Sequence, residues 1–195
     1  LMDTFDVLKE NNYAKESPIS AERETTEMML AEGEIAFMFG GNWDWSVMCE
    51  YDYTENIGMM PVPQNMDDET NTKLVGGGSK FMMIDSTVSE EQQQAAKDFL
   101  NWLVFEADGN DFLVNRCALV PAFSNIDLEV TDPLGASVKK YADAGLLIDN
   151  YNYMPDDAYA KCGAAFQKYL ADETDRAGLA AEIEAYWQAT TPVEH

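Results

Sequence analysis

Amphipathic stretches with a period near 3.6 residues alternate with short apolar runs along this chain of 195 residues. The clearest amphipathic stretch opens at Ser89, whose side chain can form a capping box with Gln92, and it ends at Gly109. Its expected buried stripe has helical spacing and consists of Ala95, Ala96, Phe99, Leu100 and Leu103. This stretch therefore predicts a long helix.

Further helices are predicted from the same spacing and from residues that begin or end helices. Asp132 followed by Pro133 marks one start, and Gly33 and Gly145 mark two ends. Asn42 can cap a short helix that begins at Trp43. The other expected helical ranges are 2–10, 20–30, 111–116, 132–145, 156–171 and 175–189.

Three short apolar runs predict β-strands. Residues 35–39 form a run short enough for a fully buried strand, residues 57–60 form a second strand that Pro61 and Pro63 end, and residues 81–84 form a third. The polar, acidic stretch at 65–72 is typical of a surface loop. Strands that alternate with helices favour an α/β layered fold over a helical bundle.

The acidic composition excludes several classes of partner. The 36 acidic and 12 basic residues give a formal net charge of −24, which repels nucleic acid and anionic membrane surfaces. No apolar run reaches the roughly 18 residues of a membrane span, and no basic segment followed by an apolar one opens the chain as a signal peptide does. The 46% of hydrophobic residues predict a soluble globular protein.

Candidates for metal or redox chemistry are weak. Cys49, Cys117 and Cys162 form no C-x-x-C pair, so we expect buried free thiols, with one disulfide and one free thiol as the alternative. The acidic runs at 67–69 and 156–157 lack the spacing of a calcium loop and are expected to be solvated. We predict no metal, no cofactor and no catalytic residue.

A glycine turn that follows the run 35–39 carries the strongest candidate site. Gly40 and Gly41 allow close backbone approach, and Asn42, Trp43 and Asp44 follow directly. A sugar needs a flat aromatic surface and fixed polar partners, and this turn supplies both. On spacing alone, a core position is the favoured interpretation of Trp43 and Trp45, and a tryptophan beside Asp44 also suits a cation–π site.

Several segments resemble the family 1 extracellular solute-binding proteins of ABC importers, the family of maltose-binding protein. They occur in the family's order at residues 33–43, 56–63, 75–79 and 95–103. The resemblance implies a periplasmic-binding-protein-like (type II) fold of two lobes, present here as a C-terminal fragment with a mixed sheet flanked by helices. Residues 1–75 and 138–195 then belong to the C-terminal lobe, and residues 76–137 pass through the N-terminal lobe.

The same resemblance implies a ligand cleft between the lobes. In the family, the tryptophan of the Gly-x-Trp turn lies in that cleft, the glycine loop often lines it, and aromatic residues join it where the chain returns to the second lobe. The candidate ligand-binding residues are Gly41, Asn42, Trp43, Asp44, Gly77, Gly78, Tyr153 and Tyr159.

The expected function is that of the substrate-binding component of an ABC transporter. Such a protein captures a carbohydrate, here expected to be an oligosaccharide, by hinge closure outside the cytoplasm and delivers it to permease subunits. Its expected location is the periplasm or the cell surface, as a lipoprotein. The alternatives are a carbohydrate-active enzyme domain and a solute-binding protein for a polyamine or other cationic solute.

Overall fold

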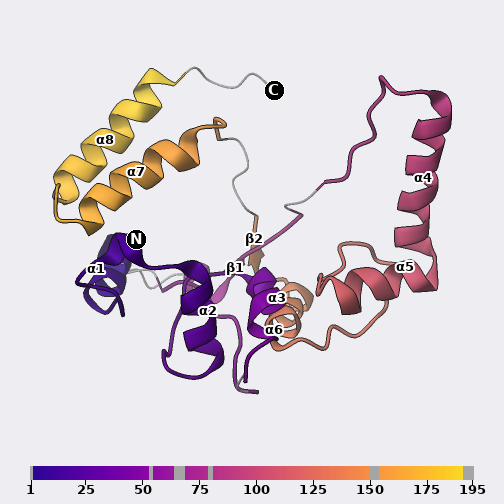
Figure 1. Ribbon diagram of the computed structural model, residues 1–195, viewed down its shortest axis with the longest axis horizontal. Coiled ribbons are helices and arrows are strands. Elements are labelled where there is room, and N and C mark those ends of the chain that lie inside the picture. The colour runs from indigo at the N-terminus through magenta and orange to yellow at the C-terminus, as the bar shows by residue number, and fades with distance from the viewer. Residues whose placement is uncertain (1, 53–54, 64–68, 79–80, 150–153, 191–195) are drawn as a thin grey trace.

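The computed structural model describes residues 2–52, 55–63, 69–78, 81–149 and 154–190. Figure 1 shows three groups of helices around one short pair of strands. The helices are α1 (Met2–Glu10), α2 (Arg23–Ala31), α3 (Trp45–Met48), α4 (Glu90–Phe105), α5 (Ala107–Asp111), α6 (Pro133–Asp143), α7 (Ala158–Leu170) and α8 (Arg176–Ala189), and the strands are β1 (Leu74–Val75) and β2 (Leu147–Ile148). Short 3-10 turns occupy Pro18–Ser20, Asn42–Asp44 and Glu69–Thr72, and a π-helical turn occupies Phe112–Arg116.

Among the described residues, three clusters of buried apolar side chains stabilise the helices. The central cluster joins α2, α3 and α6, the α4 cluster joins the end of α4 to the chain that follows it, and the α7–α8 cluster joins the last two helices. Their buried members are, in that order, Ala31, Met48 and Leu134; Leu103, Leu113, Val114, Ile126 and Val130; and Ala165, Tyr169 and Leu179. The apolar interior is therefore divided among three separate groups of helices (Figure 1).

The two strands are parallel and pair two segments that lie far apart in the sequence. Leu74 pairs with Leu147 and Val75 with Ile148. The Gly76 N–H donates to the Ile148 carbonyl at 2.9 Å, which extends the pairing by one residue. A parallel pair needs a long crossover, and here the crossover contains α4, α5 and α6.

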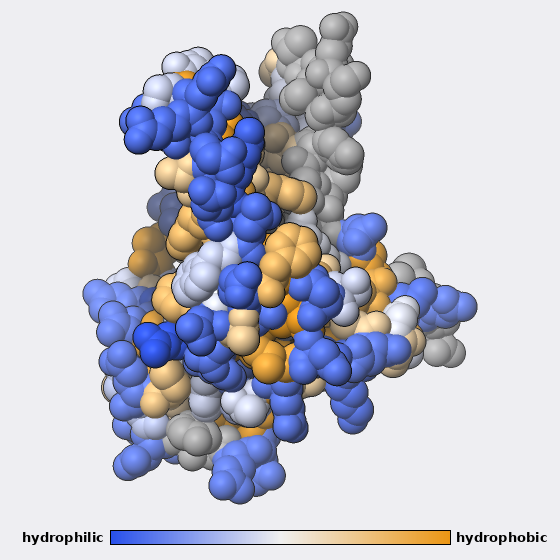
Figure 2. Space-filling model, turned by 90° about the vertical axis from the view of Figure 1, so that its right-hand side faces the viewer, coloured by the Kyte–Doolittle hydropathy of each residue, from blue (hydrophilic) through white to orange (hydrophobic). Residues whose placement is uncertain are grey.

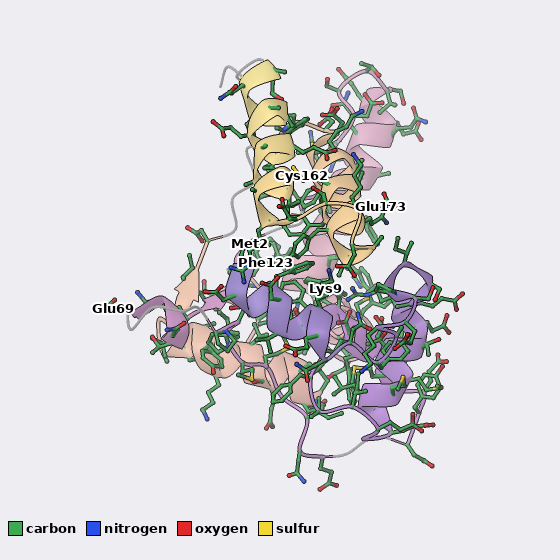
Figure 3. All side chains as sticks on the ribbon, turned by 90° about the vertical axis from the view of Figure 1, so that its left-hand side faces the viewer. Met2, Lys9, Glu69, Phe123, Cys162 and Glu173 are labelled. Carbon is green, nitrogen blue, oxygen red and sulfur yellow. The ribbon has the colours of Figure 1, made fainter. Side chains whose placement is uncertain are left out.

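Polar contacts fasten α1 to the α7–α8 hairpin. The Lys9 Nζ donates to the Tyr169 carbonyl at 2.7 Å, and the Tyr169 hydroxyl donates to the Asp6 carboxylate at 2.5 Å. Figure 3 shows Lys9 on α1 below the turn between α7 and α8 that carries Glu173. The first helix of the chain thus packs against its last two.

Helix ends account for the helices that the sequence predicted correctly. Ser89 accepts the Gln92 N–H at 3.3 Å in the expected capping box, and Asp132 accepts the Gly135 N–H at 2.6 Å before α6. Gly33 and Gly145 follow α2 and α6 with φ of +77° and +68°, a region that glycine enters without strain.

The predicted strands at 35–39, 57–60 and 81–84 are wrong, because none of the three runs has a strand partner among the described residues. Phe37 and Phe81 are largely exposed instead of buried. At Met59, the backbone N–H bonds to the Ser137 hydroxyl at 2.9 Å in place of a neighbouring strand. The described part therefore holds a two-stranded parallel sheet, and the expected mixed sheet is not confirmed.

The expected stop of the long helix at Gly109 is also wrong. The helix α4 ends at Phe105, and Gly109 lies inside the next helix, α5. A Cβ at Gly109 would lie 2.1 Å from the Trp102 carbonyl oxygen, so glycine is required for close packing of the two helices. Ala95 and Phe99, expected in the buried stripe, are exposed, because the first part of α4 extends away from its cluster (Figure 1).

Two smaller predictions also need correction. The second helix begins at Arg23 and not at Ser20, which lies in the preceding 3-10 turn. All three cysteines are free, but Cys49 and Cys117 are exposed, because neither side chain belongs to a buried cluster. No helix in the described part of the chain is long and apolar enough to cross a membrane.

The cap of α6 gives a first testable prediction. Asp132→Ala removes the acceptor of the Gly135 N–H and should lower the free energy of unfolding by about 1 kcal/mol. Burial raises the pKa of Asp132 above its ordinary value of 3.8, so its contribution to stability is largest below that pH and falls as the pH rises through the raised pKa. Asp132→Asn keeps an acceptor and removes this decline. Urea unfolding followed by circular dichroism measures both effects, and equal losses for Ala and Asn would contradict the cap.

The close packing at Gly109 gives a second testable prediction. Gly109→Ala forces a methyl group against the Trp102 carbonyl and should lower the free energy of unfolding of the α4 cluster by about 1–3 kcal/mol. Gly163→Ala is the matched control, because no atom lies within 4 Å of a Cβ at Gly163 in α7. That control should stabilise its helix by up to about 1 kcal/mol. Urea titration of both variants tests the pair, and equal changes would refute the packing role of Gly109.

Candidate ligand-binding site at the Gly-Gly-Asn-Trp turn

The candidate site is the turn between α2 and α3. The chain leaves α2 through Gly33, runs without a strand partner in the described structure to Gly40, and forms the 3-10 turn Asn42–Asp44 before α3. That turn packs against α6, and α3 contributes Met48 to the central cluster. The turn is therefore held between helices that share a core.

The buried carboxylate of Asp44 holds the turn in place through hydrogen bonds. Asp44 is only 4% exposed, and its Oδ2 accepts the Gly41 N–H at 3.0 Å. Its Oδ1 accepts a hydrogen bond from the Arg23 guanidinium of α2. Asn42, expected to cap the helix, does not cap it, because the Asp44 carboxylate binds the Gly41 N–H and Asn42 is itself the first residue of the 3-10 turn.

Arg23 joins a second buried carboxylate to this arrangement. Its Nε donates to Glu27 Oε1 at 2.9 Å, and Glu27, like Asp44, is 4% exposed. Burial raises the pKa of Glu27, the charge of Asp44 raises that pKa further, and Arg23 opposes both effects. The hydrogen bond to Asp44 raises the pKa of Arg23, so the guanidinium stays charged. We name these three residues the carboxylate–arginine network.

The two glycines allow the carboxylate and the indole to lie against the backbone. A Cβ at Gly40 would lie 2.0 Å from Asp44 Oδ2, and a Cβ at Gly41 would lie 2.3 Å from the nearest ring carbon of Trp43. The Trp43 side chain thus covers Gly41, which is buried, while Trp43 itself remains 65% exposed. The turn presents an aromatic surface supported by glycine backbone, an arrangement that does not fit a core tryptophan.

The remaining candidate residues lie elsewhere. Gly77 and Gly78 are exposed just after β1, and a Cβ at Gly77 would lie 3.2 Å from Asp149 Oδ1. Tyr159 is exposed in the first turn of α7, which Figure 1 shows apart from α3, and Tyr153 lies outside the described residues. The structure therefore joins Gly41, Asn42, Trp43 and Asp44 in one turn and does not join Tyr159 to them.

Other possible sites in the described structure have less to offer. One hollow lies between α1 and the α7–α8 turn and a second between α7 and α8, and no residue of the Gly-Gly-Asn-Trp turn lines either. Among the described residues, no three histidine, cysteine or acidic side chains come together as a metal site. Figure 2 shows apolar and hydrophilic side chains interspersed on the side of the molecule that carries α4.

Two residues of the network were missed by sequence reasoning. Arg23 and Glu27 are four residues apart on α2, a spacing that predicts an ion pair on a helix face. Nothing in that spacing indicates the contact with Asp44, which lies 21 residues beyond Arg23. Asp44 was expected to face the ligand, whereas its two oxygens bond to Arg23 and the Gly41 backbone.

The contact between Gly41 and the indole gives a third prediction. In Gly41→Ala, the new methyl group should displace the Trp43 ring without removing any hydrogen bond of the network. Acrylamide quenching of tryptophan fluorescence should change measurably, with little loss of stability because the ring is mostly exposed. Gly58→Ala is the control, since its Cβ would make an ordinary contact of 3.5 Å with Ser137. Identical quenching in the two variants would show that Gly41 does not support the ring.

Comparison with known proteins gives one match. The family model described as "Bacterial extracellular solute-binding protein" covers residues 3–145, which include the whole of the turn. Searches of curated proteins and of solved structures found no match. Such proteins act outside the cytoplasm, bind small molecules for the permease of an ABC transporter and are generally not enzymes. Because the match extends over most of the chain, this protein belongs to the bacterial extracellular solute-binding protein family.

Proposed function

We propose that this solute-binding protein captures a carbohydrate, in particular an oligosaccharide, and delivers it to the permease subunits of an ABC importer. The observation that carries the proposal is the exposed indole of Trp43 supported by the backbone of Gly41. A pyranose has apolar C–H faces that stack on such a ring, and its hydroxyl groups can bond to polar groups at the ring's edge. Asn42, half-buried beside Trp43, supplies an amide for that purpose.

The charge arrangement favours a neutral ligand over a polyamine. A cation–π site beside Trp43 gains most when a free carboxylate adjoins the ring. Asp44 is the adjoining carboxylate, and it is buried and paired with the Arg23 guanidinium. Arg23 therefore offsets one of the two buried negative charges of the network, which weakens the attraction of Asp44 for a cationic ligand.

The proposed mechanism is closure of two lobes around the sugar. Residues 76–137 are proposed to form the segment of one lobe, and residues 1–75 and 138–195 the other. The separation of the clusters supports this division, because the α4 cluster draws only on residues between 100 and 130. One buried residue of the central cluster, Leu134, comes from the end of the middle segment. Gly76 to Gly78, next to the strand pair, lie where a hinge is needed.

The other candidate residues take secondary roles in this proposal. Gly77 and Gly78 are proposed to offer backbone groups to the ligand after closure, and Tyr153 and Tyr159 to approach from the returning chain. The site is proposed to work in the periplasm or at the cell surface, where the protein is a lipoprotein. These roles depend on closure, because α7, whose first turn carries Tyr159, lies apart from α3 in this structure (Figure 1).

Ligand titration tests the proposal. The protein is titrated with glucose, maltotriose and spermidine, and binding is followed by tryptophan fluorescence and calorimetry. We expect saturable binding of a sugar without product formation, and a loss of affinity of about tenfold or more in Trp43→Ala, since one stacking contact of about 1.4 kcal/mol corresponds to tenfold.

The control variant is Trp187→Ala, which removes a partly exposed tryptophan from α8, far along the chain from the turn. It should bind the sugar with unchanged affinity. Unchanged affinity in Trp43→Ala would overturn the role of the turn. Binding of spermidine alone would replace the sugar with a cationic ligand, and release of a cleaved sugar would identify an enzyme.

A further inference from the structure

The orientation of the Trp43 indole needs an explanation beyond its own contacts. The ring is supported by Gly41 on one side and is 65% exposed. Gly40 and Gly41 restrict the backbone less than any other residues, so the turn does not hold a fixed shape by itself. A ring that is to stack on a ligand must be held in place before binding, or binding loses free energy in ordering it.

We propose that Arg23 is a positioning residue for Trp43, acting through the Asp44 carboxylate and the Gly40–Gly41 backbone, and that Glu27 fixes Arg23 in this role. The inference rests on the proposed function in so far as Trp43 touches the ligand. Three successive contacts connect α2 to the indole: Arg23 to Asp44, Asp44 to Gly41, and Gly41 to the ring.

The first contact depends on the shape of the guanidinium. Arg23 donates through Nε to Glu27 and through a terminal nitrogen to Asp44, so one planar group bridges two carboxylates. Because the five N–H donors of arginine are fixed in one plane, the Glu27 bond determines where the second donor points. A lysine offers a single ammonium on a flexible stem and cannot reproduce that bridge.

The second contact makes the position of the Gly41 backbone depend on the position of the Asp44 carboxylate. Asp44 uses one oxygen for Arg23 and the other for the Gly41 N–H. That second oxygen also occupies the space that a Cβ at Gly40 would need, at 2.0 Å. A shift of the carboxylate therefore moves Gly41, and the ring that lies on Gly41 moves with it.

The two buried carboxylates of the network depend on the positive charge of Arg23. Glu27 and Asp44 are both 4% exposed, and Arg23 is the cation that bonds to both. Without the guanidinium, two buried carboxylates would face each other without a cation, which is strongly unfavourable. Uptake of a proton by Glu27, whose pKa is already raised, removes the repulsion but leaves Asp44 without the donor that fixes it, and movement of Asp44 toward water then releases the Gly41 N–H.

The helices on either side are also joined by contacts outside the network. The helices α2 and α3 meet through the central cluster, in which Ala31 and Met48 are buried and Leu30 and Trp45 pack against them. These apolar contacts remain when Arg23 is replaced. Loss of the guanidinium is therefore expected to disturb the turn while the surrounding fold persists.

Fluorine NMR tests this inference without any ligand. The chain is labelled with 5-fluorotryptophan, its four tryptophans give four resonances, and Trp43→Phe assigns the one of interest. In Arg23→Met, we expect the Trp43 resonance to shift or broaden while those of Trp102 and Trp187 stay in place. Arg23→Lys should behave similarly, because the charge alone does not restore the bridge. Arg116→Met makes the same chemical change at an exposed arginine and should leave all four resonances unchanged.

A second readout is the affinity for maltotriose. Arg23→Met and Asp44→Asn should each weaken binding by about fivefold or more, and Arg116→Met should not. If the wild-type protein binds no sugar but its Trp43 resonance still responds to Arg23→Met, the positioning role stands and the proposed function fails. An unmoved Trp43 resonance in both Arg23→Met and Asp44→Asn would overturn the inference. Collapse of all four resonances in Arg23→Met would also overturn it, since Arg23 would then support the whole fold.

Discussion

The parallel pairing of β1 with β2 brings distant parts of this chain together. Leu74 and Val75 lie beside Leu147 and Ile148, so a crossover that includes α4, α5 and α6 begins and ends at the same place. Before β1, the chain forms the turn that carries Trp43, and after β2 it continues to the α7–α8 hairpin (Figure 1). Because only two residues of each strand take part, the arrangement depends on a short ladder supplemented by the bond from Gly76.

The turn that carries Trp43 combines an exposed ring with buried charge. An aromatic side chain at the surface has few neighbours to hold it, and a glycine turn gives it little rigidity. Here polar groups restrict the backbone that supports the ring, because Asp44 bonds to the Gly41 backbone and Arg23 connects Asp44 to α2. The same pairing offsets the charge of Asp44 directly beside the indole. A solute-binding protein gains from such a site, because a ring fixed in advance need not be ordered when the ligand arrives.

The sequence predicted the parts of this fold that depend on neighbouring residues. Ser89 with Gln92, Asp132 before Pro133, and the glycines after α2 and α6 are local signals, and the structure confirms each of them. The runs at 35–39 and 81–84 failed as strands because an apolar run becomes a strand only beside another strand, and the described chain places none next to them. The turn around Trp43 was found because its residues are consecutive. Arg23 was missed because its partner Asp44 lies 21 residues away, beyond any helical spacing.

The division of the apolar interior has a consequence for how the molecule opens. Three small clusters, each built from a few buried side chains, unfold more independently than one continuous core does. A native-state hydrogen-exchange experiment is then expected to divide the amides of these clusters into groups of different protection. The central cluster, which anchors α2 and α3, sets the lifetime of the Trp43 turn, whereas α4 can fray at its exposed end without disturbing it. A protein built in this way can rearrange one group of helices against another while the Trp43 turn stays folded.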